Sequence, residues 1–316
     1  MIFICTCSQD RTTDLLLPYL KDTPAFRFNI DRREDFAWDF SKRDFKITDI
    51  KQGIEINSKS LTSFYLRKPM YFEQITIPPE GCLENWCREE TDYVFEELYH
   101  WCEAAGKVSL VRSRSDRYGK LRQMLVAENY FRVADWHIFQ GMLPDDLTRG
   151  KWVVKSLSGA APGKGKVFFV KEVEPAELDV HYPWFLQEKI DGEDEVTVVY
   201  IAGKTIAYRY PRSSITDCDD VRKAIFDNRE LWVKCELSSA EQSAIRGFMD
   251  ETGYRFGRFD FIRKDGELWF LELNPNGQWA WLDIDNQDGL ISAIAEQILS
   301  EDRQHREVAA DLRSSL

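Results

Sequence analysis

The chain has 316 residues, enough for two or three compact modules, and it is 43% hydrophobic and 30% charged, as soluble globular proteins are. Its 54 acidic residues outnumber its 42 basic residues, and the net charge of −12 argues against a partner such as nucleic acid or an anionic membrane. No stretch is apolar enough to span a membrane, and the N-terminus lacks the features of a signal peptide. The seven scattered cysteines then indicate reduced thiols, and we expect a cytoplasmic protein.

The first hundred residues alternate short strands with helices, which predicts an N-terminal α/β domain over residues 1–110. A long helix from Leu83 to Ala105 carries apolar residues close to a 3.6-residue period, and Gly106 is placed to end it. The other expected elements are strands at 2–6, 26–30 and 63–67, a helix at 12–21, and short β segments at 36–41, 44–48 and 53–56 that form a meander at a sheet edge.

Two further modules follow, a central one over residues 111–183 and a C-terminal one over residues 184–316. Ala202-Gly203 predicts a hairpin turn, and Ser238 with Glu241 forms a capping box that opens a helix. The polar tail from Ser300 is expected to fray. The expected elements are helices at 117–130, 238–251 and 286–299, strands at 151–157, 166–173 and 185–190, a hairpin of 195–201 with 205–210, and a second hairpin within 256–274.

The second hairpin places three oxygen-bearing side chains, Asp260, Glu272 and Asn274, on two adjacent apolar strands. Carboxylates in so apolar a setting are costly unless a cation pairs with them. Hard oxygen ligands suit Mg²⁺, usually with nucleotide phosphates completing the coordination shell. The alternative is an ordinary amphipathic hairpin with a solvated acidic face, but the Asn-Pro-Asn-Gly-Gln-Trp sequence directly after the strand favours the metal interpretation.

The parity of the hairpin loop decides whether these side chains share a face. Asp265-Gly266 predicts the turn, but a two-residue loop would pair Asp260 with Leu271 and send Glu272 to the opposite face. A three-residue loop of residues 264–266 pairs Arg258 with Glu272 and keeps Asp260 on the same face. The metal interpretation therefore predicts a loop of odd length. The residues expected to line the other face as core are Phe259, Phe261, Leu271 and Leu273.

A lysine and a glycine-rich loop lie upstream of the hairpin. Lys155 is expected on an apolar strand, where an ammonium group needs an anionic partner. The loop that follows contains Gly159, Gly163 and Gly165, which let backbone amides approach an anion closely, as in phosphate-binding loops. A plain mobile turn is the alternative for this loop.

The segment Gln187-Glu188-Lys189-Ile190 ends the next strand, where backbone groups could meet an adenine edge. Glu193 and Glu195 are then placed to accept hydrogen bonds from ribose hydroxyls, although a solvated acidic turn would have the same composition. The order of these features along the chain favours a nucleotide site. A lysine is followed by the glycine-rich loop, then by the segment 187–190, an acidic residue and the three predicted metal ligands.

Five motifs make the chain similar to the ATP-grasp peptide maturases that produce graspetides, the microviridin-type synthetases, and the resemblance covers nearly all of the chain. They are the opening Met1-Ile-Phe-Ile-Cys-Thr6 with Phe26-Arg-Phe-Asn-Ile-Asp31, Tyr65-Leu-Arg-Lys-Pro69, Lys120-Leu-Arg-Gln123, Asp220-Val-Arg222 and Leu271-Glu-Leu-Asn-Pro-Asn-Gly-Gln-Trp279. The resemblance implies an α/β (α+β) ATP-grasp fold with an N-terminal pre-ATP-grasp domain.

The resemblance also implies roles for single residues. Lys120 and Lys155 would hold ATP phosphates, and Asp260, Glu272 and Asn274 would hold Mg²⁺. Arg222 would contact the transferring phosphoryl group or the acyl phosphate. Arg258, beside the metal ligands, could hold the incoming carboxylate of the substrate, and its alternative is a salt bridge to Glu272. The remaining nucleotide contacts are expected from Gly159, Gly163, Gly165, Gln187, Glu188, Ile190 and Glu195.

The implied activity is that of an ATP-dependent ligase that macrocyclises a ribosomally made precursor peptide through side-chain ester or amide bonds. Its partners would be a precursor with leader and core segments and, as a homodimer, a second copy of the chain. The chain departs from the family where it has Glu193-Asp-Glu195 in place of Asp-x-Arg, and Glu195 is instead similar to the ribose-binding glutamate of D-alanine:D-alanine ligase. The alternatives are a ligase that joins free amino acids or modifies a protein terminus, and a nucleotide-binding module without catalysis.

Overall fold

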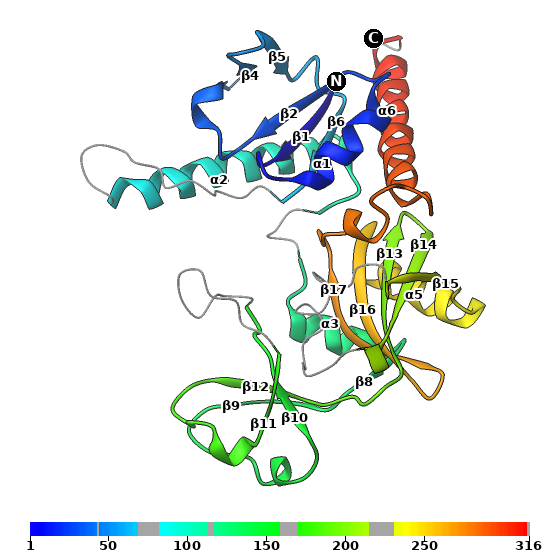
Figure 1. The fold of residues 1–316 in the computed structure, drawn as a ribbon. Helices are drawn as coiled ribbons and strands as arrows, with labels where there is room; N and C mark the ends of the chain where they lie inside the picture. Colours follow the sequence, from blue (N-terminus) through cyan, green and yellow to red (C-terminus); the bar gives the residue numbers. More distant parts are fainter. Residues whose placement is uncertain (43, 69–81, 113–116, 159–169, 215–230, 315–316) are drawn as a thin grey trace. The chain divides into compact units, whose positions relative to one another are not determined.

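The computed structural model describes residues 1–42, 44–68, 82–112, 117–158, 170–214 and 231–314 (Figure 1). The chain divides into two compact units. Unit 1 comprises Met1–Arg117, Tyr254–Phe256 and Pro275–Leu316, and unit 2 comprises Tyr118–Gly253 and Gly257–Asn274. The three-domain division expected from the sequence stays a prediction that this two-unit division does not test.

Unit 1 is built on a parallel sheet with the strand order β2-β1-β6-β7. Its strands are β1 (Ile2–Thr6), β2 (Ala25–Asn29), β6 (Ser63–Leu66) and β7 (Val108–Ser109). Every residue of β1 is buried, as expected for an inner strand of a parallel sheet with both faces covered. The helical elements of the unit are α1 (Arg11–Leu16), η1 (Leu17–Leu20), η2 (Arg33–Asp35), α2 (Cys82–Ala104), η7 (Ala280–Leu282) and α6 (Leu290–Ser314).

The predicted meander forms a sheet of its own in unit 1, with antiparallel strands β3 (Phe36–Phe40), β4 (Phe45–Asp49) and β5 (Ile54–Asn57). Its buried side chains join one aromatic core with the parallel sheet and α2. Phe28 of β2 stacks on Phe95 of α2 with 4.5 Å between ring centroids, and meets Phe36 edge to face. One shared apolar core therefore joins the parallel sheet, the three-stranded meander and α2.

The expected fraying beyond Ser300 is wrong, because α6 continues to Ser314. Two acidic residues of this polar stretch, Glu301 and Asp302, are buried. Glu301 pairs with Arg255 at 2.7 Å, and Asp302 accepts a hydrogen bond from Thr62. Their charges are therefore compensated inside unit 1, and composition alone could not reveal this.

A buried arginine organises the end of β6. Arg67 has no exposed surface, and its Nη1 donates to the carbonyl and side-chain oxygens of Asn276 at 3.0 and 2.7 Å. Its Nη2 donates to Gln278 and to Thr12, and Asp10 lies 3.8 Å from Nε. The motif residue Arg67 thus ties the loop after Asn274 to the start of α1 within unit 1.

Unit 2 contains an antiparallel four-stranded sheet with the order β11-β10-β12-β9. Its strands are β9 (Trp136–Phe139), β10 (Trp152–Val154), β11 (Lys171–Val173) and β12 (Trp184–Glu188), and the 3-10 turns η3 (Asp145–Thr148) and η4 (Pro175–Glu177) lie in its connections. A small core of Phe139, Trp152, Val154 and Leu186 holds this sheet together.

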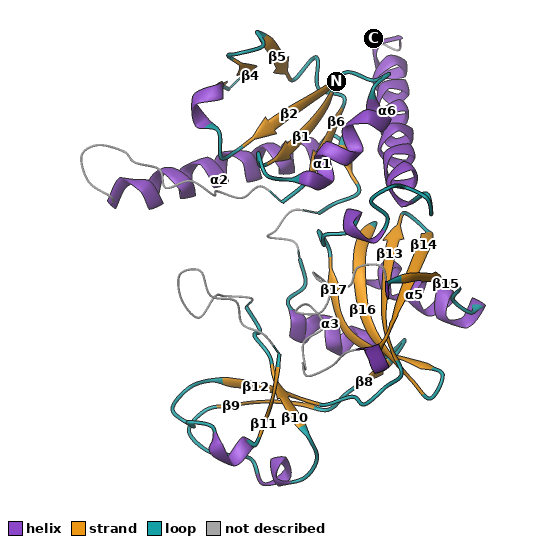
Figure 2. Cartoon of the chain, in the orientation of Figure 1, coloured by secondary structure: helices purple, strands orange, loops and turns teal. Residues whose placement is uncertain are grey.

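A second sheet of unit 2 has the order β15-β14-β13-β16-β17-β8 (Figure 2). Its strands are β8 (Arg132–Val133), β13 (Asp194–Ile201), β14 (Lys204–Pro211), β15 (Val233–Cys235), β16 (Phe256–Lys264) and β17 (Glu267–Asn274), accompanied by η5 (Arg212–Ser214), α3 (Lys120–Ala127) and α5 (Ser239–Thr252). The predicted hairpin about Ala202 and the capping box of Ser238 and Glu241 are confirmed. Phe248 of α5 packs on Phe259 at 5.4 Å, so α5 covers the face of β16 opposite to Asp260.

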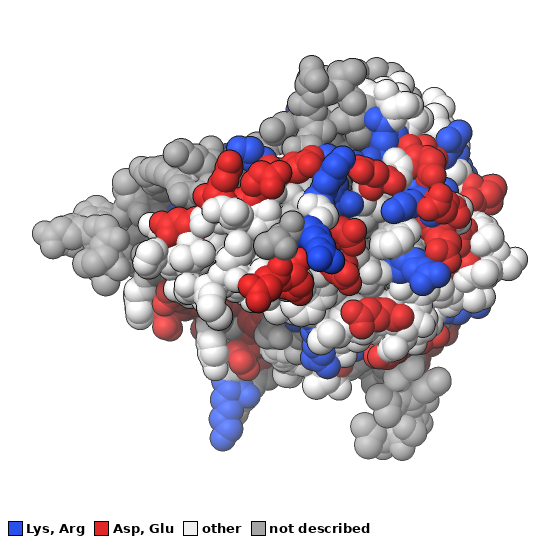
Figure 3. Space-filling model, turned by 90° about the horizontal axis from the view of Figure 1, so that it is seen from below, with Lys and Arg blue, Asp and Glu red and all other residues white. Residues whose placement is uncertain are grey.

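In the part of the chain described, none of the helices is both long and apolar enough to cross a bilayer. On the face seen in Figure 3, acidic side chains lie among lysines and arginines. On that face the excess of acidic residues is therefore spread among basic ones, and neither sign forms a broad continuous patch.

Candidate active site

The hairpin of β16 and β17 brings the predicted metal ligands to one face by means of a β-bulge. Asp265 and Gly266 form a two-residue turn with φ of +52° and +77°, and pairing runs regularly from Lys264 opposite Glu267 to Phe261 opposite Phe270. The register then shifts, and Asp260 lies directly opposite Glu272. The predicted three-residue loop is wrong. The extra residue that places Asp260 and Glu272 on the same face is Leu271, which lies in the strand and not in the turn.

The bulge also changes which side chains face the core. Phe259, Phe261 and Leu273 are buried on the face opposite to the carboxylates, as predicted. Leu271 is the exception, because it packs with a separate cluster of Ala134, Ile190, Ile262 and Trp269. The expectation for Leu271 assumed an uninterrupted alternation of side chains, which the bulge breaks.

Asp260 and Glu272 are bridged by an amide and flanked by cations. Asn274 Nδ2 donates to Asp260 Oδ2 and to Glu272 Oε1, both at 3.0 Å. Arg258 Nη2 lies 2.8 Å from Asp260 Oδ2. The salt bridge of Arg258 is therefore with Asp260, whereas the alternative role considered for Arg258 was a salt bridge with Glu272. Thr197 of β13 donates to Asp260 Oδ1 at 3.0 Å. The two carboxylate side chains keep 25% and 31% of their surface exposed, so they remain accessible from solvent.

The two carboxyl groups differ in their titration. Burial raises the pKa of Asp260; Arg258 opposes this shift and the negative charge of Glu272 adds to it. Burial would also raise the pKa of Glu272, but the charge of Lys120, the hydrogen bond from Asn274 and the charge of Lys155 lower it below the usual range. Asp260 is therefore the member of the pair whose negative charge is incompletely compensated, and a bound cation would relieve it.

The donor set fits a hard divalent cation that shares its coordination shell with another ligand. Two carboxylates and an amide on one face are oxygen donors of the kind that Mg²⁺ takes. Among the described residues, no group of three Asp, Glu, His or Cys side chains is placed to hold a metal ion. A cation held by Asp260, Glu272 and Asn274 would thus need oxygens from outside the protein, as Mg²⁺ takes from nucleotide phosphates.

Two lysines from other elements act on the carboxylates, Lys120 by direct contact and Lys155 through its charge. Lys120 opens α3, and its Nζ lies 3.1 Å from Glu272 Oε2 and 2.9 Å from the carbonyl oxygen of Ser156. Lys155 follows directly after β10, which ends at Val154 and is shorter than predicted. Its Nζ donates to Gln187 Oε1 at 2.5 Å. The structure thus brings the two predicted phosphate lysines together with the predicted metal ligands.

The segment predicted to meet an adenine edge is largely bonded within the chain. The side chain of Gln187 is buried and holds Lys155, while the N–H groups of Glu188 and Lys189 donate to the carbonyl oxygens of Asp135 and Lys151, each at 2.8 Å. Ile190 is buried in the cluster with Ile262. The N–H groups of Glu188 and Lys189 are therefore not available to an adenine edge.

Glu195 lies on β13, two residues before Thr197 and on the same face of the sheet. Its carboxylate accepts a hydrogen bond from Arg212 Nη1 at 2.6 Å. The preceding turn approaches β16 closely, since a Cβ on Gly192 would lie 2.4 Å from the carbonyl oxygen of Arg263. Only glycine fits there, and the chain can therefore deliver Glu195 to the face that carries Asp260.

Some of the predicted site residues, namely Gly159, Gly163, Gly165 and Arg222, lie outside the described residues. The sequence interpretation in turn missed Thr197 and the carbonyl of Ser156. Thr197 carries a usable signal, because strand alternation from Glu195 places it on the same face. The Ser156 carbonyl carries none, because any residue supplies one.

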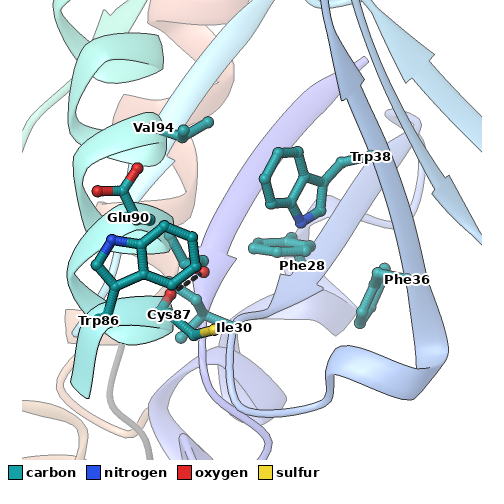
Figure 4. Close-up of a pocket in the computed structure, with 9 residues that line it drawn as sticks. Phe28, Ile30, Phe36, Trp38, Trp86, Cys87, Glu90 and Val94 are labelled. Carbon is teal, nitrogen blue, oxygen red and sulfur yellow. Dashed lines mark hydrogen bonds between the residues drawn. The ribbon is translucent and has the colours of Figure 1, made fainter. Parts of the chain in front are cut away.

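An apolar groove of about 430 Å³ lies within unit 1, between α2 and strands β2 and β3 (Figure 4). Trp86 and Trp38 stand on its two sides, and Phe28 lies next to Trp38. Glu90 is the charged group among its nine lining residues, which include neither lysine nor arginine. The groove is therefore unsuited to phosphates and is no candidate for the nucleotide site.

Comparisons with known proteins find solved structures only: no protein-family model and no curated protein matches the chain. The RiPP-associated ATP-grasp ligase of Chryseobacterium gregarium, in complex with ADP and a leader and core peptide, matches with a TM-score of 0.80 and 18% identity over 95% of this chain and 96% of its own. The macrocyclase MdnC of Microcystis aeruginosa, bound with the precursor peptide MdnA, matches with a TM-score of 0.79 and 19% identity over 95% and 99% of the two chains.

A third structure, the ATP-grasp ligase PsnB with a phosphomimetic variant of its minimal precursor, Mg and ADP, matches with a TM-score of 0.69 and 16% identity over 95% and 98% of the chains. At such low identity the likeness establishes the fold, and the chain has the α/β ATP-grasp fold. The expected resemblance to ATP-grasp peptide maturases is thereby confirmed in structure, over about 95% of the chain.

Proposed function

We propose that this chain is an ATP- and Mg²⁺-dependent carboxylate ligase that macrocyclises a ribosomally synthesised precursor peptide. One observation carries the proposal. On an ATP-grasp fold, Asp260, Glu272 and Asn274 lie on one face of a hairpin, and the ammonium group of Lys120 lies 3.1 Å from the Glu272 carboxylate. Oxygen donors for a cation beside an ammonium group for phosphates are what phosphoryl transfer from ATP requires.

The residues divide the work of phosphoryl transfer by charge. Asp260, Glu272 and Asn274 would hold Mg²⁺, which when bound supplies positive charge to the nucleotide phosphates. Lys120 and Lys155 would leave their present partners, Glu272 and Gln187, to bind phosphate oxygens. Glu195 would accept a hydrogen bond from the ribose, with its carboxylate held in place by Arg212. The protein then contributes positioning and charge neutralisation and no covalent chemistry of its own.

The substrate chemistry follows in two steps. A side-chain carboxylate of the precursor attacks the γ-phosphorus of ATP and forms an acyl phosphate, with ADP as the leaving group. A Ser or Thr hydroxyl, or a Lys amine, then attacks the acyl carbon, loses its proton and expels phosphate, and an ester or amide closes the ring. Arg258, 2.8 Å from Asp260, is placed to orient the incoming carboxylate, and we assign Arg222 to the transferring phosphoryl group.

The proposed partners are the precursor peptide, with leader and core segments, and a second copy of the chain in a homodimer. The leader, core and precursor peptides bound by the neighbouring ligases support a peptide substrate here. Glu195, which pairs with Arg212, favours a second candidate function, a ligase for free amino acids. The reason is that Glu195 is similar to the ribose-binding glutamate of D-alanine:D-alanine ligase. A nucleotide-binding module without catalysis is disfavoured by the complete cluster of lysines and oxygen donors.

The test is the intact mass of a short peptide encoded beside this chain, after incubation with the protein, ATP and Mg²⁺. We expect the loss of one water per ring formed, with ATP consumed in step, and neither change with the Glu272→Gln variant. An unchanged peptide mass beside active ATP hydrolysis would contradict the macrocyclase and favour small amino-acid substrates. Absence of ATP hydrolysis under all conditions would contradict the ligase itself.

A further inference from the structure

Gln123 belongs to the Lys120-Leu-Arg-Gln123 motif, but neither the metal nor the phosphates need it as a ligand. It lies on α3 and is buried, with 4% of its surface exposed. A buried amide must have both ends satisfied, because each unpaired polar group costs free energy. The question is therefore what the two ends of the Gln123 side chain bind.

Both ends bind backbone groups on opposite sides of the site. Nε2 donates to the carbonyl oxygen of Tyr118 at 2.9 Å, just before α3 begins. Oε1 accepts the N–H of Leu273 of β17, also at 2.9 Å. One side chain thus ties the start of a helix to a strand that lies 150 residues later in the sequence.

The bond to Leu273 falls between two predicted metal ligands. Leu273 follows Glu272 and precedes Asn274, so Gln123 fixes the peptide group that joins Glu272 to Leu273. Among the described residues, β8 pairs with β17 only at Trp269 and Phe270. The Leu273 N–H lies beyond the end of β8, and the amide of Gln123 takes the place that a neighbouring strand would fill.

The same side chain determines where Lys120 points. Lys120 and Gln123 are three residues apart on α3, so they lie on one side of the helix. Gln123 binds the backbone at Leu273, and Lys120 reaches the adjoining Glu272 side chain at 3.1 Å. The N-cap Gly119 provides no side-chain hydrogen bond, so Gln123 is a fixed tether for the first turn of the helix.

The contact extends to the second lysine. Met124, the next residue on α3, lies with its Sδ 3.8 Å from Gln187 Nε2, and the other end of the Gln187 amide holds Lys155. The first turn of α3 is therefore connected to both ammonium groups of the site. A shift of this turn would displace Lys120 directly and Lys155 through Gln187.

We propose that Gln123 is a positioning residue of the nucleotide site: it sets the distance between Lys120 and the oxygen donors of β17. The proposal rests on the proposed function, since it concerns the binding of nucleotide phosphates with a divalent cation. Gln123 touches neither phosphate nor cation in this assignment, and it acts through Lys120 and the backbone between Glu272 and Asn274.

The test is the affinity of the full-length chain for ADP with Mg²⁺, measured by titration calorimetry. Gln123→Met keeps the side-chain length and removes both hydrogen bonds, and we expect Mg·ADP to bind at least about tenfold more weakly. The matched control is Gln242→Met on α5, whose Nε2 donates to the carbonyl oxygen of Leu237 at 3.0 Å, and it should bind as the wild type does. Gln123→Asn, too short to reach both partners, takes the place of the Met variant if circular dichroism shows that the latter does not fold.

A double-mutant cycle separates positioning from general support of the fold. In a Lys120→Met background, Gln123→Met should weaken Mg·ADP binding by a clearly smaller factor than in the wild type, because only the part of its effect that acts through the backbone of β17 remains. An equal loss in both backgrounds, or wild-type affinity of the Gln123 variant, would overturn the proposal while leaving the proposed function intact. Failure of the wild-type chain to bind Mg·ADP would overturn both.

Discussion

Two polar clusters of this chain differ in how their charges are held. Around Arg67 in unit 1, a fully buried guanidinium group meets mainly neutral oxygens, those of Asn276, Gln278 and Thr12. Around Asp260 in unit 2, two partly exposed carboxylates meet the ends of Lys120 and Arg258. The guanidinium group of the first cluster is closed to solvent, whereas the second cluster keeps part of its surface exposed, where a ligand could reach it.

This difference predicts a structural role for the first cluster and a ligand-binding role for the second. Partners of Arg67 come from backbone and short side chains, and removing the arginine would leave several of them buried and unpaired. In the second cluster, the pKa of Asp260 is raised by burial even though Arg258 is beside it, so the resting arrangement is not the most favourable one for its charge. We therefore expect mutations in the Arg67 cluster to act mainly on stability and mutations in the Asp260 cluster to act mainly on the response to ligands.

The largest effect is expected from Arg67→Met. Loss of a buried charge with this many partners should lower the free energy of unfolding by about 3–5 kcal/mol, measured by urea denaturation. Arg209→Met is the control, since Arg209 is half exposed and pairs with Asp194 at 3.4 Å, and it should cost no more than about 1 kcal/mol. Equal midpoints for the two variants would remove the distinction between the clusters.

Glu272→Gln should lower Mg²⁺-dependent ATP turnover by about 10²–10³-fold, since it removes one of the two negative charges assigned to hold Mg²⁺ beside the phosphates. The thermal midpoint should stay close to that of the wild type, because the glutamine amide still meets Asn274. Glu267→Gln on the same strand, an exposed partner of Arg132, should turn over ATP normally. If Glu272→Gln remains active, the second cluster does not hold the cation.

Cation binding should depend on pH through Asp260. Because the pKa of Asp260 is raised, a proton competes with the cation at pH values where an ordinary aspartate is already ionised. Mg²⁺ affinity should therefore tighten as the pH rises, by up to about tenfold per pH unit below that pKa, with release of a proton. Calorimetry in buffers of different ionisation enthalpy measures this release, and a release unchanged in Asp260→Asn would assign the proton to another group.

A smaller effect is expected from Glu195→Gln, which should weaken nucleotide binding by up to about tenfold through the loss of a charged acceptor for the ribose. Fluorescence anisotropy of a labelled ATP analogue measures the change. Asp194→Asn on the opposite face of β13, where Asp194 pairs with Arg209, should leave the affinity unchanged. Equal affinities of the Glu195 and Asp194 variants would remove Glu195 from the nucleotide site.

The smallest effect is a gain in stability without ligand. A carboxyl group whose pKa is raised on folding stabilises the protein below its unfolded pKa, and this stabilisation is lost as the pH rises through the folded pKa. At neutral pH the ionised Asp260 is therefore unfavourable, and Asp260→Asn should raise the melting temperature by about 2–4 °C in the absence of Mg²⁺. A lower melting temperature at neutral pH would mean that the Arg258 ion pair outweighs burial.

Sequence patterns predicted the elements that local chemistry determines. The capping box of Ser238 and the Ala202-Gly203 turn depend on neighbouring residues alone, and the structure contains both. The bulge at Leu271 could not be predicted in this way. The sequence shows the same alternation of apolar residues whether the extra residue lies in the turn or in the strand. The continuation of α6 depends on partners of Glu301 and Asp302 that are distant in sequence.

The candidate site shows the same division. Residue types and spacing identified Asp260, Glu272 and Asn274, and the family motifs indicated Lys120. That the ammonium of Lys120 meets Glu272, and that Arg258 pairs with Asp260, follows from the packing of α3 and from rotamers that no motif encodes. Gln123 contributes through hydrogen bonds to the backbone of Tyr118 and Leu273, which leave no periodic trace in a sequence.

The bulge at Leu271 divides the second hairpin into two ladders with separate registers. The outer ladder runs from the exposed Asp265-Gly266 turn to Phe261 and Phe270, and the inner ladder carries Asp260 and Glu272. A change of length at the turn can be absorbed by gain or loss of the bulge, before it reaches the inner ladder. The turn is therefore a favourable place to insert a fluorophore tag or an epitope, or to graft a foreign loop, while the carboxylates keep their pairing.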